Sequence, residues 1–146
     1  MEGSQRRRQV TFALLAAAAA TATDYAYLAL IGNQGGSDPI GGTVRLVSGY
    51  IAAIAVAALI GLAFALAGRI TAAKTAFLAA AAGSATLGFL AIFSIGLALL
   101  ITTGLLAMAA RTTGPLPGAR PWLWPVLCSL IAMVGLIAGF VVIGTF

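Results

Sequence analysis

The sequence predicts an all-α fold, an integral membrane bundle of four transmembrane helices with short loops. Hydrophobic residues make up 62% of the 146 residues and charged residues only 8%, whereas a soluble domain carries about 25% charged residues. The apolar residues form long runs, and about 20 such residues cross the hydrocarbon core of a bilayer. Glycine, proline and charged residues separate the runs. We therefore expect one transmembrane domain over residues 1–146.

The first span is expected at residues 10–31, directly after the basic residues Arg6, Arg7 and Arg8. At 1.5 Å per residue a helix of this length reaches across the hydrocarbon. A cleaved secretory signal peptide is the alternative, because an A-x-A motif lies inside the run. The run resumes beyond Asp24, which favours a first helix that is retained.

The next segment, residues 32–43, is dense in glycine and other turn formers and is expected to be a loop. A second apolar run predicts a span at residues 44–67. Residues 68–74 are polar enough to turn and too few to form a domain. They are expected to connect the second span to the third.

The third span is expected at residues 75–105, as one tilted and overhanging helix. The alternative is five crossings, with this segment broken near residues 94–96, but that break would contain few turn-forming residues. A loop rich in proline and glycine is predicted at residues 106–121, and the last span at residues 122–146.

The distribution of basic residues predicts the orientation, because Lys and Arg are enriched in cytoplasmic loops. With four crossings both termini lie on the cytoplasmic side, together with the larger group of basic residues. That group is Arg6, Arg7, Arg8, Arg69 and Lys74, while the opposite side receives Arg45, Arg111 and Arg120. A five-crossing chain would bring Arg111 and Arg120 to the cytoplasmic side and strengthen the bias.

Aromatic and basic side chains are expected to anchor the spans at the two membrane surfaces. Arg6, Arg7 and Arg8 would serve on the cytoplasmic side. The aromatic anchors are expected on the non-cytoplasmic side, where Tyr50 would also lie; they are Tyr25, Tyr27, Trp122 and Trp124.

One carboxylate, Asp24, lies inside the first span. A charged group within the hydrocarbon is costly and needs a partner or a purpose. Arg45 opens the second span and could reach toward Asp24, with Tyr50 at nearly the same depth. We expect either an ion pair or hydrogen bond that pins the first two helices, or a group that titrates a proton or coordinates a cation in a transport path.

Small residues recur every fourth position along three of the runs, and such stripes allow helices to approach closely in lipid. These stripes are Gly49, Ala53, Ala57, Gly61 and Ala65 in the second run, Ala80, Ser84 and Gly88 in the third, and Gly135 and Gly139 in the last. Two stripes could satisfy each other within the bundle. The third, Gly135 and Gly139, is therefore expected to face a partner.

The residue types leave little room for catalysis. Histidine is absent, and Glu2, Asp24 and Asp38 are the only carboxylates, so histidine-based metal sites, Ser-His-Asp chemistry and paired acid-base catalysis lose their usual groups. The single cysteine, Cys128, is expected to be a small core residue. We expect no enzyme activity, metal or cofactor. The net charge of +5 reflects topology and not nucleic-acid binding, because the basic residues flank apolar runs.

These observations predict a multi-pass membrane protein that acts as a structural or accessory subunit of a membrane complex or homo-oligomer, packing through its small-residue faces. Its partners would be the lipid bilayer and other membrane subunits or copies of itself. The alternative is a small oligomeric transporter or channel that uses Asp24. The bias to alanine and glycine is typical of a GC-rich bacterial genome, so a bacterial plasma membrane is the expected location.

Overall fold

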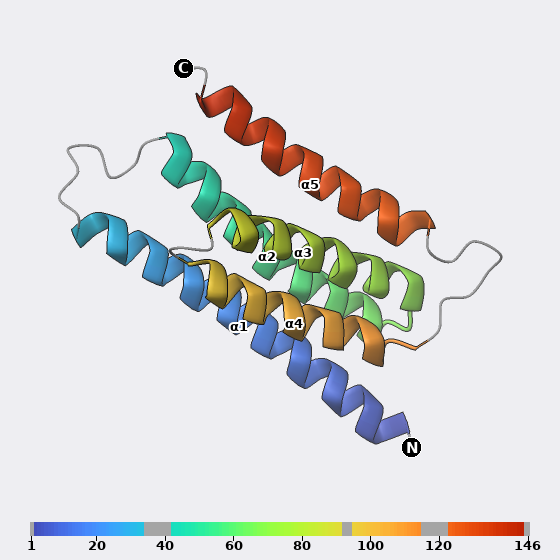
Figure 1. The fold of residues 1–146 in the computed structure, drawn as a ribbon. Coiled ribbons are helices and arrows are strands. Elements are labelled where there is room, and N and C mark those ends of the chain that lie inside the picture. Colours follow the sequence, from blue (N-terminus) through green and yellow to red (C-terminus); the bar gives the residue numbers. More distant parts are fainter. Residues whose placement is uncertain (1, 34–41, 92–94, 115–122, 145–146) are drawn as a thin grey trace.

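Five α-helices make up the part of the chain that the computed structural model describes, residues 2–33, 42–91, 95–114 and 123–144 (Figure 1). They are α1 (Glu2–Asn33), α2 (Gly42–Leu66), α3 (Ile70–Leu90), α4 (Gly96–Thr112) and α5 (Leu123–Gly144). The first four form a ring in which each helix packs against the next and α4 closes against α1. The fifth lies outside the ring, mainly against α3 and with a smaller contact to α2.

The core of the ring is built from small residues around a few large ones. Alanines such as Ala13, Ala16 and Ala20 of α1 are almost completely buried. The largest fully buried side chains include Phe77 of α3 and Leu99 of α4. Where side chains are this small, helix backbones approach closely and gain dispersion contacts, which is the principal way in which helices associate within lipid.

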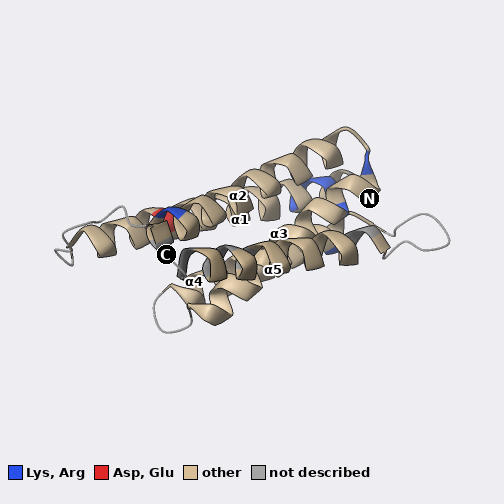
Figure 2. Ribbon diagram, turned by 90° about the horizontal axis from the view of Figure 1, so that it is seen from above, with Lys and Arg blue, Asp and Glu red and all other residues tan. Residues whose placement is uncertain are grey.

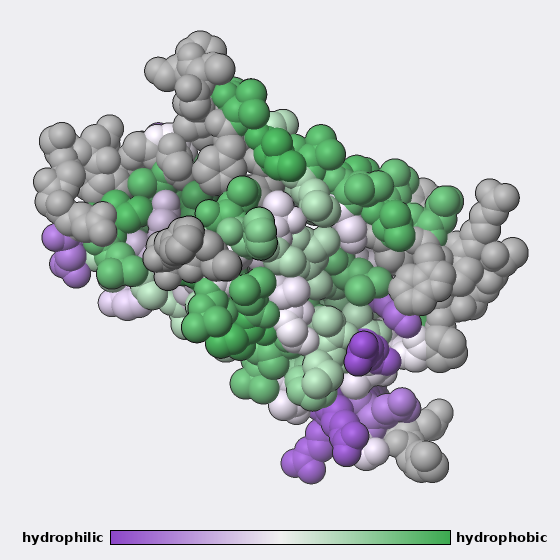
Figure 3. All heavy atoms as spheres, viewed as in Figure 1, coloured by the Kyte–Doolittle hydropathy of each residue, from purple (hydrophilic) through white to green (hydrophobic). Residues whose placement is uncertain are grey.

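The outer surface is apolar in a way that suits lipid. The helices α1, α2 and α3 are long and apolar enough to cross a membrane, and α4 and part of α5 are shorter apolar segments. Bulky hydrophobic side chains point outward, among them Phe89 at 74% exposure and Leu97 at 71%. Figure 3 shows hydrophobic residues over α5 and hydrophilic ones gathered over the start of α1. The chain has the architecture of a helical integral membrane protein.

Several threonine hydroxyls within the helices are satisfied by their own backbone. Thr21, Thr23, Thr86 and Thr102 each donate to the carbonyl oxygen four residues earlier, at 2.7 to 3.1 Å. A hydroxyl that bonds in this way needs neither water nor a neighbouring helix. These residues therefore sit in apolar spans without an unsatisfied polar group.

The expected single helix over residues 75–105 is wrong, because the chain breaks in this segment as the alternative had it. The count of four spanning helices is not confirmed. The segment holds two helices of 21 and 17 residues that pack side by side, α3 ending at Leu90 and α4 beginning at Gly96. Glycine makes this turn possible. A Cβ on Gly96 would collide with the carbonyl oxygen of Gly88, so a side chain there would force the two helices apart.

Other boundaries also differ from the expected ones. Helix α1 begins at Glu2, well before residue 10, and α3 begins inside the predicted loop 68–74. Gly68 makes this connection short, because its positive φ of 74° reverses the chain directly after α2. Helix α4 continues to Thr112, inside the predicted loop 106–121, before Gly114 takes a φ of 89°. Most of the predicted loop 32–43 lies outside the described residues.

The five-helix arrangement places the start of α1 and the end of α5 at opposite ends of the bundle (Figure 1). This arrangement does not support the expectation that both termini share one side, which rested on an even number of crossings. Two long-range hydrogen bonds hold the starts of α1 and α3 to the end of α4. Gln9 Nε2 donates to Thr113 Oγ1 at 3.1 Å, and Lys74 Nζ donates to the Gly114 carbonyl at 2.7 Å.

We call the end of the bundle at which α1 and α3 begin and α4 ends the basic end, because six described basic residues lie there (Figure 2). They are Arg6, Arg7, Arg8, Arg69, Lys74 and Arg111. Arg111 was expected on the other side and instead joins the main group, because α4 returns the chain. At the opposite end the described part of the chain carries Arg45 at the start of α2. Arg120 lies outside the described residues.

Candidate functional site

Asp24 lies in α1, in the half of that helix away from the basic end. Its side chain is partly buried, and its Oδ1 is buried without a hydrogen-bond partner in the described structure. Arg45 is exposed and does not donate to this oxygen. A carboxylate oxygen shielded from water and without a donor is costly, so this site departs from simple packing.

Tyr50 was expected at nearly the same depth as Asp24, and its side chain contacts α3 and α5. Its hydroxyl donates to the carbonyl oxygen of Ala132 at 2.9 Å and so joins α2 to α5. The same hydroxyl would lie 2.7 Å from a Cβ built on Gly83 of α3, so only glycine leaves room for it. Tyr50 therefore joins α5 to the ring of helices. The sequence analysis did not single out Gly83, the residue that leaves space for the Tyr50 side chain.

The stripe in α3 lies at the contact with α4. Ser84 is fully buried and donates to the Leu99 carbonyl at 2.8 Å. A Cβ on Gly88 would lie 3.1 Å from the Gly96 carbonyl oxygen and 3.2 Å from Leu99 Cβ. Ala80 is buried as well.

The small-residue stripe in α2 is buried in one half and exposed in the other. Gly61 is buried, and a Cβ there would lie 2.8 Å from the ring of Phe77 in α3. Ala57 and Ala65 are partly buried against the core, whereas Gly49 and Ala53 are exposed. Only the half nearer the basic end therefore packs inside the ring.

The first glycine of the stripe in α5, Gly135, is uncovered. Gly135 is exposed, and a Cβ built on it meets nothing within 4 Å. Its neighbours on α5 are exposed too, with Ile131 and Val134 both at 63%. The side-chain surroundings of position 139 lie outside the described residues.

The expected surface anchors lie at both ends. Arg6, Arg7 and Arg8 are exposed at the basic end. At the other end Tyr25 is 77% exposed, and Tyr27 is half-buried. Position 124 belongs to the first turn of α5 and therefore lies at the basic end, so the expectation that it shares a surface with Tyr25 is wrong. Neither Trp122 nor the side chain of Trp124 is among the described residues.

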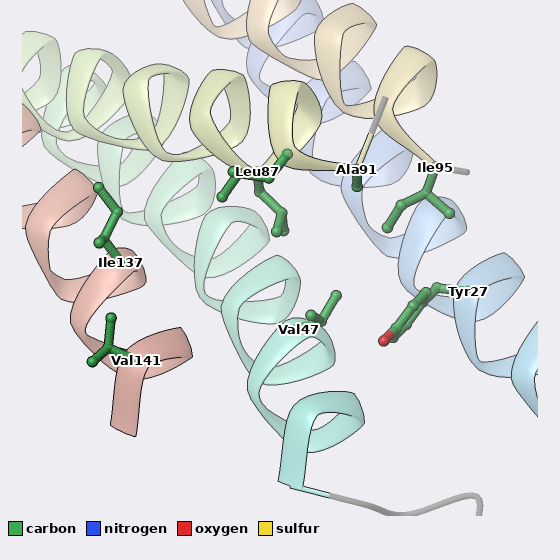
Figure 4. Close-up of a pocket in the computed structure, with 8 residues that line it drawn as sticks. Tyr27, Val47, Leu87, Ala91, Ile95, Ile137 and Val141 are labelled. Carbon is green, nitrogen blue, oxygen red and sulfur yellow. The ribbon is translucent and has the colours of Figure 1, made fainter. Parts of the chain in front are cut away.

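A hollow of about 520 Å³ lies between the ring and α5, with Tyr27 of α1 in its wall (Figure 4). Its walls come from every described helix except α4, together with the turn before α4. They include Tyr27 of α1, Val47 of α2, Leu87 of α3, Ile95, and Ile137 and Val141 of α5. Tyr27 is the one described lining residue with a hydrogen-bonding side chain, and Figure 4 shows its hydroxyl pointing from α1 toward α2.

A second hollow, of about 490 Å³, lies on α2, α3 and α5 toward the basic end. Phe64, Thr75 and Cys128 are among its walls. The Thr75 hydroxyl is buried there without a partner in the described residues. Cys128 is partly buried beside it.

Sequence reasoning singled out Tyr27 but none of the other lining residues of the larger cavity. Val47, Leu87 and Ile137 are apolar residues in apolar helices, so nothing in the pattern distinguishes them from residues that face lipid. No protein-family model matches the chain, and neither curated proteins nor solved structures include one similar to it. The candidate site therefore depends on geometry alone.

Proposed function

We propose that this chain is a structural or accessory subunit of a membrane assembly, and that α5 is the helix that meets its partner. The observation that carries the proposal is the contrast between glycines. Gly61, Gly88 and Gly96 are closed by neighbouring helices within the chain, whereas Gly135 faces open space. Gly49 and Gly104 are open as well, but they belong to helices of the ring, each of which packs against two ring neighbours, whereas α5 lies outside the ring and packs mainly against α3. In lipid an uncovered glycine on a helix otherwise lined by bulky residues is where a second helix can approach closely.

Gly135→Leu tests this proposal, with Gly104→Leu as the matched control. Gly104 of α4 is also helical and exposed, and a Cβ there also meets nothing within 4 Å. Both variants therefore make the same chemical change without a clash inside the chain. Particle mass in a mild detergent should fall for Gly135→Leu and stay at the parent value for Gly104→Leu. Equal masses for the parent and both variants would contradict the assignment of α5.

The accessory role itself depends on what the particle contains. After gentle extraction, a larger protein in fixed stoichiometry with this chain would support an accessory subunit, and copies of this chain alone would support a homo-oligomer. A monomer free of other protein would count against both.

A transporter that uses Asp24 is the second candidate, and the buried Oδ1 without a partner favours it. Carboxylates within membrane spans commonly mark proton or cation paths. Asp24→Asn keeps the size of the side chain and removes its charge. If Asp24 carries protons, this variant should abolish proton flux in vesicles that report internal pH while the bundle still assembles. Parent vesicles that show no flux above protein-free vesicles would exclude this role for proton movement.

The proposed location is a bacterial plasma membrane, with the basic end at the cytoplasmic face. Six described basic residues lie at that end, against Arg45 at the other. Such a bias is the strongest sequence determinant of membrane orientation. The end of α5 would then lie on the non-cytoplasmic side.

A further inference from the structure

Two arginines near the start of α1 line a hollow on the outer surface of that helix. Arg7 and Arg8 lie in its wall together with Ser4, Thr11 and Phe12, and its volume is about 270 Å³. These five positions are three or four residues apart along α1, so they share one face of the helix. Figure 3 shows hydrophilic residues gathered over this start of α1. No acidic residue is among the described walls.

This face of α1 points away from the rest of the bundle. The buried side chain of Gln9 bonds to Thr113 of α4. Gln9 lies two residues from both Arg7 and Thr11, which is about 200° around the helix. Arg7, Arg8 and Thr11 are all exposed, and neither arginine has an ion-pair partner among the described residues. Both guanidinium groups are therefore open to a ligand from outside the chain.

The hollow lies at the depth of lipid headgroups. Helix α1 is long and apolar enough to cross a membrane, and its apolar run begins at Val10. Arg8 and Arg7 precede Val10 by two and three residues, or about 3 to 5 Å along the helix axis. The polar layer on each side of the hydrocarbon core is about 5 to 8 Å thick. Both arginines therefore lie within the layer that contains the lipid phosphates.

An apolar surface continues from the hollow toward the middle of the membrane. Leu14 and Leu15 lie about two turns beyond Arg7 and Arg8 on the same side of α1, and each is 49% exposed. The guanidinium group of arginine binds phosphate through two parallel hydrogen bonds. A phosphate bound at the hollow would thus have its acyl chains beside exposed leucines, which is the arrangement that a phospholipid needs.

We propose that this hollow is the headgroup site of an anionic phospholipid, in which Arg7 and Arg8 bind the phosphate and an acyl chain lies along Phe12 and Leu15. The volume of about 270 Å³ is just below the range of about 300 to 1,000 Å³ for sites that enclose a small molecule. It suits a headgroup whose acyl chains remain in the bilayer. The site is independent of the proposed subunit role, because none of its described walls belongs to α5.

The first test must separate this site from diffuse attraction to the basic end. Arg7→Gln combined with Arg8→Gln removes two charges from the hollow. Arg6→Gln combined with Arg111→Gln is the matched control, since these arginines are also exposed at the basic end but do not line the hollow. Phosphatidylglycerol, or diacylglycerol with the same acyl chains, is titrated into delipidated protein in a neutral detergent. Bound lipid per chain is counted by native mass spectrometry.

We expect the Arg7 and Arg8 double variant to bind phosphatidylglycerol at least about tenfold more weakly than the parent, because each basic residue near an anionic lipid contributes about fivefold. The control double variant should stay close to the parent, and diacylglycerol should bind all three proteins equally weakly. Equal losses in the two double variants would overturn the site in favour of diffuse attraction. Displacement of phosphatidylglycerol by inorganic phosphate would overturn the lipid as the ligand in favour of free phosphate.

A second measurement needs no substitution. Phosphatidylglycerol with a photoreactive group on its headgroup is crosslinked to the parent chain, and labelled positions are mapped by peptide mass spectrometry. Gln5 is an internal control, because it is exposed beside Ser4 but does not line the hollow. We expect saturable labelling at Ser4 and Thr11 that unlabelled phosphatidylglycerol displaces. Labelling of Gln5 to the same extent as Ser4 would contradict a defined site on this face of α1.

Discussion

The close contact between α3 and α4 makes Gly96→Ala the most informative single substitution for the fold. A Cβ on Gly96 would collide with the carbonyl oxygen of Gly88 and would lie 2.8 Å from the carbonyl oxygen of Ala91. Both obstacles are backbone atoms, which cannot rotate away as a side-chain end could. The added methyl group must push α4 away from α3 and weaken the bond from Ser84 to Leu99.

Overpacking of this kind costs about 1 to 3 kcal/mol, so we expect the free energy of unfolding to fall by about that amount in Gly96→Ala. Gly104→Ala is the control, because a Cβ at Gly104 meets nothing within 4 Å. Alanine is a better helix former than glycine by about 1 kcal/mol. The control should therefore be as stable as the parent, or more stable by up to about 1 kcal/mol.

The assay is titration of the detergent-solubilised protein with dodecyl sulfate, with unfolding followed by circular dichroism. The two variants should shift the transition midpoint in opposite directions or, at least, by clearly different amounts. If Gly96→Ala and Gly104→Ala gave the same midpoint, the close approach of α3 and α4 would be refuted. The fold would then be nearer to the single long helix that the sequence predicts.

Two further substitutions test the core and the basic end. Phe77→Ala removes a fully buried phenyl group from the core of the helix bundle and should lower the free energy of unfolding by about 3 kcal/mol. This value is the lower end of the range in soluble cores, because the unfolded chain stays among apolar lipid or detergent. A loss of well under about 1 kcal/mol in the same titration would argue against this packing. Gln9→Leu and Thr113→Val, made singly and together, should show a coupling of about 0.5 to 1.5 kcal/mol, since their hydrogen bond is buried; strict additivity would mean that the bond contributes nothing.

The sequence predicted the helical membrane class well because that prediction depends on a strong physical constraint. Backbone groups in hydrocarbon must bond within their own segment, so an apolar run of 20 residues has little choice but to be a helix. The start of α2 at Gly42 agrees closely with the expected span at 44–67. The connection at Gly68 was also visible, since glycine followed by a basic residue interrupts the apolar pattern.

The turn between α3 and α4 was expected only as the alternative, a break near residues 94–96, because the signals that mark the other loops are weak there. Turn formers such as proline, asparagine and aspartate mark loops that water solvates. Here the helix ends within an apolar segment, and what permits the reversal is the pair Gly88 and Gly96, eight residues apart, with Ser84 bonding across to Leu99. In the sequence these residues resemble an ordinary small-residue stripe. Only the fold reveals that the stripe and its partner belong to one hairpin.

The candidate site was half predictable. Asp24 is conspicuous as the carboxylate in an apolar run, and its position in α1 was expected. The direction of Tyr50 was not, because depth along a helix does not determine which neighbour a side chain faces. The cavity beside Tyr27 depends on how far the end of α5 departs from the ring, and no local pattern in α5 encodes that distance.

The central claim is that the chain folds back between α3 and α4, so that the end of α4 lies at the end of the bundle at which α1 begins. The direct measurement is labelling with a membrane-impermeant maleimide in intact cells and in inverted vesicles, in a Cys128→Ala background. Three single-cysteine variants at exposed positions suffice, Asn33→Cys, Arg69→Cys and Arg111→Cys. Five crossings predict that Arg69→Cys and Arg111→Cys react from one face and Asn33→Cys from the other. Reaction of Arg111→Cys from the same face as Asn33→Cys would contradict the account.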